Sequence, residues 1–473
     1  MHVPLVVLGG GPGGYAAAFL AADLGIEVAL VEQDERLGGT CLLRGCIPSK
    51  ALLHVGRVLA ESREMEEWGI HFQKPTLDLA ALRARKEKVI GTLTSGLATL
   101  ARRRNVTLIR GVARFTSSTS LEIAEPTGGR SALSFDHCIL ASGSRPALLP
   151  AFDIGSERVM DSTGALELRD IPETLLVVGG GYIGLEMGTV YAELGSQVSV
   201  VELTDILLPG ADRDLVKPLQ QRLEKLFAAI HLRTKVTRLE DTGAAVRVSF
   251  EGPAGPFTQE FSRVLVAVGR RPNSDGLGLE HTGVVVNGKG FVEVDDRQRT
   301  ADPQILAIGD VCGEPMLAHR ASHQGKVAVE ALHGEPAVFA PRAIPAVVFT
   351  DPEIAWAGLT EQEAAAAGRV VEISRYPWAA SGRAHALGRT DGLTKMLLDP
   401  ETDTVLGVGI VGSGAGELIA EAVLAIEMGC SARDLAETIH PHPTLGETVA
   451  FSAENYFGLA TEIYRPKSES SAR

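Results

Sequence analysis

Residues 3–14 read VPLVVLGGGPGG, a short apolar run followed by a glycine-rich turn. An alanine-rich stretch over 15–24 comes next, and then a second apolar run that ends at Glu32. This order predicts a strand, a helix and a strand, with the GxGxxG pattern at the first turn. The glycines let the backbone approach a pyrophosphate, the helix N-terminus stabilises its charge, and the acid accepts a ribose hydroxyl. Because glycine-rich turns are common, one such pattern alone is weak evidence for a dinucleotide-binding site.

The same arrangement recurs 170 residues further along the chain. The glycines at 9, 14 and 25 correspond to those at 179, 184 and 195, and Glu32 corresponds to Glu202. Two fingerprints with one spacing predict two dinucleotide-binding sites. The ribose end of the second unit reads Glu202-Leu203-Thr204-Asp205, without arginine or lysine. An acid there repels a 2′-phosphate, so NAD is favoured over NADP.

The run GGTCLLRGCIPSK (38–50) places four residues between Cys41 and Cys46. In a regular helix such positions lie about 8–9 Å apart between Cα atoms, whereas a disulfide needs less than about 7 Å. The pair can close only if the backbone is distorted, and Gly45 and Pro48 provide the means. Such a bridge would be strained and therefore redox-active. Two unrelated buried thiols are the alternative, and the spacing disfavours zinc.

The cysteine pair also indicates which nucleotide belongs to which turn. It follows the first unit, so we expect that unit to hold a flavin, which exchanges electrons with a disulfide. A nicotinamide nucleotide at the second site would then exchange hydride with the flavin.

Composition narrows the functional class. The chain has 473 residues, enough for roughly three domains, and 45% of them are hydrophobic. A net charge of −14 argues against nucleic acid or an anionic membrane as partners. Five cysteines are too few for a secreted disulfide framework. We find no signal peptide and no apolar run long enough to span a membrane, so we expect a cytoplasmic protein. No metal site is expected.

The motifs together resemble one family. The cysteine run, the two fingerprints, Gly-Arg-Arg-Pro-Asn at 269–273 and Ile-Gly-Asp at 308–310 resemble the flavin-dependent pyridine-nucleotide disulfide oxidoreductases. Within that family, the runs PWAASGRA (377–384), AIEMGC (425–430) and HPTL (442–445) are most similar to the dihydrolipoamide dehydrogenases. The resemblance extends from residue 3 to about 460.

The resemblance implies an α/β fold with two Rossmann-like dinucleotide-binding domains, for FAD and NAD, and a C-terminal α+β dimerisation domain. The alternating pattern from about residue 344 agrees with an antiparallel sheet there. The expected boundaries are 1–148 for the FAD-binding domain with the redox disulfide, 149–271 for the NAD-binding domain, 272–343 for a central segment completing the FAD domain, and 344–473 for the interface domain.

The resemblance also implies a homodimer whose active sites use both chains. Cys41 would exchange with the substrate and Cys46 would face the flavin. His442 of the other subunit would act as the base, with its imidazole oriented by Glu447. Lys50 and Glu186 resemble the family's ion pair beside the flavin ring. We take His440, two residues from His442, to be a structural histidine.

The remaining expected site residues bind the cofactors. Those for FAD are Gly9, Gly11, Gly14, Glu32, Gly39, Thr40, Ser142, Gly143, Asp310, Ala318 and His319. Those for NAD are Gly179, Gly181, Gly184, Glu202 and Gly269.

The implied activity is reoxidation of protein-bound dihydrolipoamide to lipoamide, with NAD⁺ reduced to NADH. The implied partners are a lipoylated acyltransferase or the carrier protein of glycine cleavage. A glutathione- or mercuric-type reductase of the same family, and a non-catalytic complex subunit, are the alternatives. Pro441 and the segment 318–325 depart from the family's usual residues. Which complex the protein serves does not follow from the sequence.

Overall fold

The computed structural model describes residues 1–464, and residues 465–473 of the expected C-terminal domain lie outside that part. The chain forms two compact units, each assembled from separated stretches. The first takes residues 1–172, 238–247 and 262–340, and the second takes 173–237, 248–261 and the chain from 341 onward. The two glycine-rich turns therefore lie in different units.

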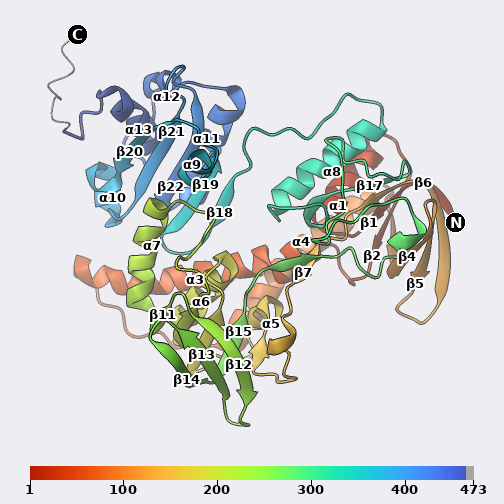
Figure 1. Cartoon of the computed structure of the whole chain (residues 1–473), viewed down its shortest axis with the longest axis horizontal. Coiled ribbons are helices and arrows are strands. Elements are labelled where there is room, and N and C mark those ends of the chain that lie inside the picture. Colours follow the sequence, from red (N-terminus) through yellow and green to blue (C-terminus); the bar gives the residue numbers. More distant parts are fainter. Residues whose placement is uncertain (465–473) are drawn as a thin grey trace. The chain divides into compact units, whose positions relative to one another are not determined.

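The first unit is built around a parallel sheet that an antiparallel meander extends (Figure 1). The parallel part has the order β3-β2-β1-β6-β17, and β5 and then β4 continue the sheet from the N-terminal half of β6. Its strands are β1 (His2–Leu8), β2 (Val28–Glu32), β3 (Thr107–Arg110), β4 (Val112–Ser117), β5 (Ser120–Ala124), β6 (Arg130–Leu140) and β17 (Ile305–Ala307).

β1 shows why its apolar run forms a central strand. Val6 and Leu8 enter the core on one face of the sheet, and Leu5 and Val7 enter the core on the other. Because side chains of a strand alternate between faces, a strand covered on both sides is apolar throughout. The glycine-rich turn therefore begins where a fully buried strand ends.

Two helices pack closely on one face of this sheet. They are α1 (Pro12–Asp23) and α8 (Ala318–Leu332). A Cβ atom at Gly325 would lie 2.6 Å from the carbonyl oxygen of Gly13, so only glycine at 325 permits this approach. The helix α1 begins at Pro12, three residues before the expected alanine-rich stretch, because proline suits the first helical position.

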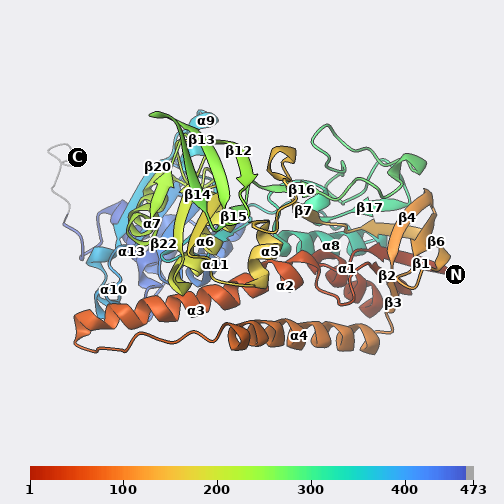
Figure 2. The same cartoon turned by 90° about the horizontal axis from the view of Figure 1, so that it is seen from below.

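Three further helices of this unit carry or flank the cysteines. They are α2 (Gly39–Arg44), α3 (Cys46–Glu64) and α4 (Leu79–Arg103). Figure 2 shows the chain running out along α3 and returning along α4. Asp78 caps α4, since its Oδ1 accepts from the Ala81 backbone N–H at 2.9 Å.

The second unit repeats the arrangement of a strand, a glycine-rich turn, a helix and a parallel strand. Its parallel strands are β9 (Thr174–Val178), β10 (Gln197–Val201) and β11 (Ala229–His231), with β10 between the other two. Two helices accompany them, α6 (Tyr182–Leu194) and α7 (Arg213–Leu226).

The same unit contains a five-stranded antiparallel sheet of order β18-β19-β22-β21-β20. Leu215 of α7 lies against this sheet at Gly409, where a Cβ atom would be 2.5 Å from a Leu215 methyl group. The strands are β18 (Ala346–Val348), β19 (Glu353–Gly358), β20 (Glu372–Pro377), β21 (Leu393–Leu398) and β22 (Val405–Gly412). Its main helices are α11 (Ala415–Met428), α12 (Ala432–Glu437) and α13 (Glu447–Phe457), seen around the sheet in Figure 1.

Besides its 3-10 helices, the described chain has further strands and α-helices. They are β7 (Ser144–Pro146), β8 (Val159–Met160), α5 (Ser162–Glu167), β12 (Lys235–Asp241), β13 (Val246–Gly252), β14 (Gly255–Phe261), β15 (Arg263–Val266), β16 (Arg270–Pro272), α9 (Glu361–Ala366) and α10 (Gly382–Leu387).

Candidate active site

The two cysteines lie on either side of a break between helices. Cys41 belongs to α2, Gly45 has φ −147° and ψ −113°, and Cys46 is the first residue of α3. A Cβ atom at position 45 would lie 2.8 Å from the Thr40 carbonyl oxygen, so the break requires glycine. The expected distortion is confirmed at Gly45, while Pro48 sits within the first turn of α3, where a helix tolerates proline.

The cysteines are close enough to influence each other's protonation. Both are thiols, and a hydrogen bond with the Cys46 thiol, followed by burial, raises the pKa of Cys41 well above its usual range. The positive charge of Lys50 acts in the opposite direction. Once one thiol of the pair has lost its proton, the negative charge of that thiolate opposes deprotonation of the other thiol.

Two features near the pair were not expected from the sequence. Burial and then the charges of Cys41 and Cys46 raise the pKa of Tyr15 in α1. Arg44 donates two hydrogen bonds to the carboxylate of Asp34 and so ties α2 to the end of β2. Tyr15 carries no signal in the sequence, because a tyrosine at a helix start is ordinary.

The two glycine turns have the same geometry 170 residues apart. Gly9 and Gly179 have φ of 113° and 112°. The backbone N–H of Gly10 donates to Oε2 of Glu32 at 2.5 Å, and that of Gly180 donates to Oε2 of Glu202 at 2.7 Å. The predicted repeat is therefore a repeat in structure.

The third glycine of each turn is required by close packing. A Cβ atom at Gly14 would lie 1.8 Å from the carbonyl oxygen of Gly9, and one at Gly184 would lie 2.2 Å from that of Gly179. Position 181 has no heavy atom within 4 Å of its would-be Cβ, so the second turn leaves open space beside its glycine. This bare backbone at a helix N-terminus fits a pyrophosphate.

Further expected flavin residues meet in the first unit. Gly39 lies against Gly11, since its Cβ atom would be 2.6 Å from the Gly11 Cα. Asp310 accepts a hydrogen bond from the Ser144 hydroxyl at 2.5 Å, which fixes its carboxylate beyond β17. Ser142, whose hydroxyl donates to the Asn273 carbonyl at 2.7 Å, precedes Gly143 at φ 70°. The glycine surface and the oriented acid suit a dinucleotide with a ribityl chain.

The remaining expected flavin residues also belong to the first unit. Thr40 belongs to α2, and Ala318 and His319 form the start of α8. In the divergent segment 318–325, Gln324 is buried and its Oε1 accepts from the Gly309 backbone N–H at 2.8 Å. The departure from the family's usual residues is thus stabilised within the fold.

At the second site, Glu202 is held by several donors. Its Oε1 accepts from the backbone N–H of Thr204 at 2.8 Å and from the Thr204 hydroxyl at 2.9 Å. This oriented carboxylate fits a nucleotide ribose. Gly269, with φ 112° and open space at its would-be Cβ, lies in the other unit, so its place at this site stays a prediction.

His442 and Glu447 form the expected couple in the second unit. The Nδ1 atom of His442 lies 2.8 Å from Oε1 of Glu447, and Oε2 accepts from the Thr444 backbone N–H at 2.7 Å. The imidazole is 77% exposed, whereas the Glu447 side chain is 11% exposed. The base is exposed, and the buried carboxylate that orients it has a hydrogen bond at each oxygen. Such a base can take a proton from a ligand.

His440 has the opposite environment. Its Nε2 lies 2.7 Å from Glu421, its Nδ1 lies 2.8 Å from the Thr438 carbonyl oxygen, and its side chain is 9% exposed. Both nitrogens are engaged, which confirms its structural role. Glu186 is also buried and accepts from the Phe349 backbone N–H at 3.0 Å. Its pairing with Lys50, which lies in the other unit, stays a prediction.

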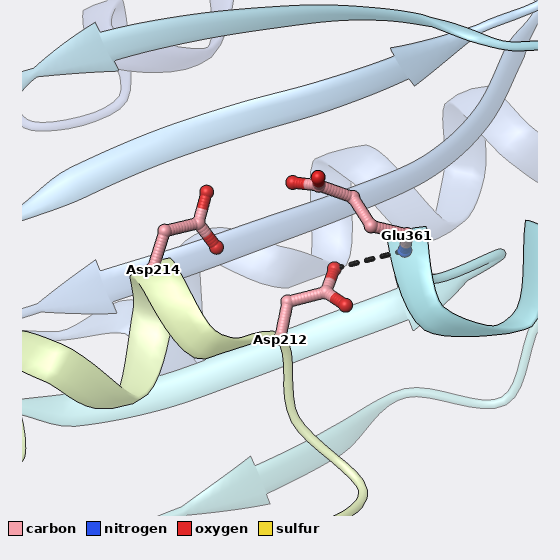
Figure 3. A group of neighbouring side chains, drawn as sticks. All are labelled: Asp212, Asp214 and Glu361. Carbon is pink, nitrogen blue, oxygen red and sulfur yellow. Dashed lines mark hydrogen bonds between the residues drawn. The ribbon is translucent and has the colours of Figure 1, made fainter. Parts of the chain in front are cut away.

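Three carboxylates of the second unit point toward one another: those of Asp212, Asp214 and Glu361 (Figure 3). Such a group could bind a metal ion, but the Nζ atom of Lys395 lies 2.7 Å from an oxygen of each. Lys395 is 1% exposed. The cation of this cluster is therefore an ammonium group of the chain itself.

Comparison with known proteins agrees with this geometry. Residues 3–325 match the pyridine nucleotide-disulphide oxidoreductase family, and residues 344–453 match its dimerisation domain, which supports a homodimer. The dihydrolipoyl dehydrogenases of Vibrio parahaemolyticus and Haemophilus influenzae are each 48% identical over 98% of this chain and 97% of their own.

Two solved structures have the same fold over nearly the whole chain. LpdA from Mycobacterium tuberculosis has a TM-score of 0.89 and 28% identity, covering 96% of this chain and 100% of its own. The flavoprotein disulfide reductase RclA from Escherichia coli, in a Cu(II) complex, has a TM-score of 0.87 and 28% identity, covering 96% and 99%. Within residues 1–464, no helix combines the length and apolar character needed to cross a membrane. The protein's cofactors are FAD and NAD, and the chain belongs to the pyridine nucleotide-disulphide oxidoreductase family.

Proposed function

We propose that the protein is a dihydrolipoyl dehydrogenase, which oxidises protein-bound dihydrolipoamide to lipoamide and reduces NAD⁺. The observation that supports this most is the Cys41–Cys46 pair at a helix break. It occurs in a chain 48% identical to dihydrolipoyl dehydrogenases over nearly its whole length. The acid at the second ribose end favours NAD and counts against an NADPH-dependent glutathione reductase.

In the proposed reaction the oxidised enzyme contains a Cys41–Cys46 disulfide. His442 of the partner subunit takes a proton from one substrate thiol, and the thiolate attacks Cys41 Sγ. The Cys41–Cys46 bond breaks and Cys46 leaves as a thiolate. The second substrate thiol then displaces Cys41, which closes the lipoamide disulfide and leaves two reduced cysteines. FAD and NAD, when bound, supply the two-electron acceptors that return the pair to the disulfide.

The proposal assigns supporting roles to other groups. Lys50 and Glu186 would form the ion pair beside the flavin. The turn at 9–14 with Glu32, Gly39, Thr40, Ser142, Gly143, Asp310, Ala318 and His319 would hold FAD, and the turn at 179–184 with Glu202 and Gly269 would hold NAD. The domain boundaries proposed are those expected from the sequence, at 148/149, 271/272 and 343/344.

The proposed setting is a cytoplasmic multienzyme complex. The partner would be a lipoylated acyltransferase or a glycine-cleavage carrier protein, and the net charge of −14 suits a basic docking domain. Binding that weakens as ionic strength rises would support this, because salt screens exposed charges. Binding unaffected by salt would contradict the charge argument.

An anaerobic titration with dihydrolipoamide tests the activity. The purified protein should show a flavin spectrum, and reduction should produce long-wavelength absorbance from a thiolate beside the flavin. Cys46→Ser should abolish that absorbance. Protein purified without flavin, or turnover with NADPH and glutathione in place of NAD⁺ and dihydrolipoamide, would refute the proposal.

A further inference from the structure

The ribose end of the second nucleotide turn has a cation that its local sequence lacks. Arg233 follows β11, and its guanidinium donates to Oδ2 of Asp205 at 3.2 Å. Arg233 is 28 residues away in the chain, so the segment 202–205 gave no sign of it. An arginine beside a ribose-binding acid is the group that accommodates a 2′-phosphate in NADP-binding proteins.

The backbone fixes the Arg233 segment beside this turn. The Glu202 backbone N–H donates to the His231 carbonyl at 2.8 Å, the Arg233 N–H donates to that of Thr204 at 2.8 Å, and the Thr234 N–H donates to that of Glu202 at 3.0 Å. Arg233 also has φ 51°, a left-handed conformation that is uncommon for residues other than glycine. The position of Arg233 is therefore determined by the fold.

The contact between Arg233 and Asp205 is easily exchanged. One hydrogen bond joins them, and their side chains are 69% and 55% exposed. Exposed ion pairs of this kind are weak, and guanidinium groups bind phosphate with two parallel hydrogen bonds when they are free to do so. A 2′-phosphate would thus compete with Asp205 for Arg233, and the Asp205 carboxylate would repel it.

Glu202 is suited to bind the ribose, whereas Asp205 contacts the nearby cation. A carboxylate offers about four acceptor positions, and three donors already occupy part of this set. The remaining capacity suits a ribose hydroxyl. Asp205 faces the arginine that could otherwise favour the phosphorylated ribose.

We propose that Asp205 is a selectivity residue: by neutralising Arg233 it keeps a built-in 2′-phosphate subsite closed, so that the site takes NAD. This inference rests on the proposed NAD site. It predicts that removing the Asp205 carboxylate is enough to increase the affinity for a 2′-phosphorylated nucleotide. No new arginine is needed, because Arg233 is already present.

Calorimetric titration of the FAD-loaded protein with 5′-ADP and with 2′,5′-ADP tests it. Wild-type protein should bind 5′-ADP better. Asp205→Ala should tighten 2′,5′-ADP binding by about 10-fold, or ~1.4 kcal/mol, and leave 5′-ADP within about twofold. The gain should shrink as salt rises, because it is electrostatic. Arg233→Gln added to Asp205→Ala should remove it.

A matched control is Glu122→Ala, which removes an exposed carboxylate paired with Arg130 at 2.9 Å in the other unit. It should change neither affinity. The proposal is overturned if Asp205→Ala gives no gain, if the gain survives Arg233→Gln, or if Glu122→Ala matches it. Failure of wild-type protein to bind 5′-ADP would show that the proposed NAD site itself is wrong.

Discussion

The hydrogen bond between Nδ1 of His442 and Glu447 determines which ring nitrogen is available for chemistry. A carboxylate only accepts, so in the neutral imidazole Nδ1 carries the proton and Nε2 keeps its lone pair; the ring is 77% exposed. Glu447 also accepts from Thr444 through its second oxygen. One buried carboxylate thus fixes both the tautomer and the loop that presents the base.

Replacing His442 should remove the base and leave the fold intact. We expect His442→Gln to lower kcat for dihydrolipoamide oxidation by about 10²–10⁴-fold, the usual contribution of general base catalysis. Steady-state kinetics would measure the loss, with unchanged thermal unfolding as the check on folding. His440→Gln is the matched control, and an equal loss of kcat there would contradict the assignment of His442.

Glu447→Gln should be milder than loss of the base but still costly. The amide has one acceptor oxygen, whereas Glu447 uses two, toward His442 and Thr444. Either the imidazole or the loop therefore loses its partner. We expect at least a roughly tenfold fall in kcat, together with an altered pH profile. Wild-type kcat and pH dependence in this variant would show that the carboxylate does not position the base.

Gly45→Ala should disturb the break between α2 and α3. Its Cβ atom would meet the Thr40 carbonyl oxygen at 2.8 Å, and a backbone atom cannot rotate away. We expect a loss of about 1–3 kcal/mol in the free energy of unfolding and slower closure of the cysteine pair. Gly91→Ala in α4 is the control, because nothing lies within 4 Å of its Cβ and alanine favours helix by about 0.5–1 kcal/mol. Equal effects of the two changes would contradict the geometric argument.

The coupled cysteines should react one at a time. The hydrogen bond with Cys46 and then burial hold the pKa of Cys41 high, so one thiolate of the pair suppresses the other. In reduced protein we expect one fast equivalent of alkylation at this site, counted by mass spectrometry against the Cys41→Ser/Cys46→Ser variant. Burial also raises the pKa of Cys138 and Cys312, which should stay unmodified. Two equally fast equivalents from the pair would exclude the coupling.

Lys395→Met should destabilise the second unit strongly. It leaves the carboxylates of Asp212, Asp214 and Glu361 without their buried cation, at a cost of about 3–5 kcal/mol. Arg375→Met is the comparison, because Arg375 contacts two of the same acids but is 42% exposed and should matter less. Chemical unfolding would measure the free energy of unfolding of both variants, and an equal loss in the two would contradict the special role of Lys395. Stabilisation of Lys395→Met by added divalent metal would instead reveal a latent metal site.

The same cluster predicts that stability falls as the pH is lowered. Burial would raise the pKa of Asp214, but hydrogen bonds and charges from Lys395 and Arg375 outweigh it, and the pKa is lowered. A lowered folded-state pKa gives stability that is present above the unfolded value, about 3.9. That stability is lost as pH falls through the folded value. Acid unfolding should therefore depend on Lys395, and an acid profile identical in Lys395→Met would contradict this.

Local patterns predicted the parts of the site that depend on local geometry. The glycine turns, the acids at 32 and 202, and the helix break at Gly45 all follow from short-range backbone requirements. Contacts between distant stretches could not be predicted in this way. Lys395 meets Asp214 across 181 residues, and Arg233 reaches Asp205 only because β11 lies beside β10. In each case the partner is an ordinary charged residue whose neighbours in the sequence give no sign of the contact.

The chain order of the first unit has a consequence for biosynthesis. β17, which pairs with the last three residues of β6, and α8, which packs on α1, are translated after residues 173–237 of the other unit. Until then a nascent chain leaves the edge of β6 at 138–140 without its neighbour, and unpaired sheet edges promote aggregation. Newly made protein should accordingly be prone to aggregation until residues up to 332, the end of α8, have left the ribosome.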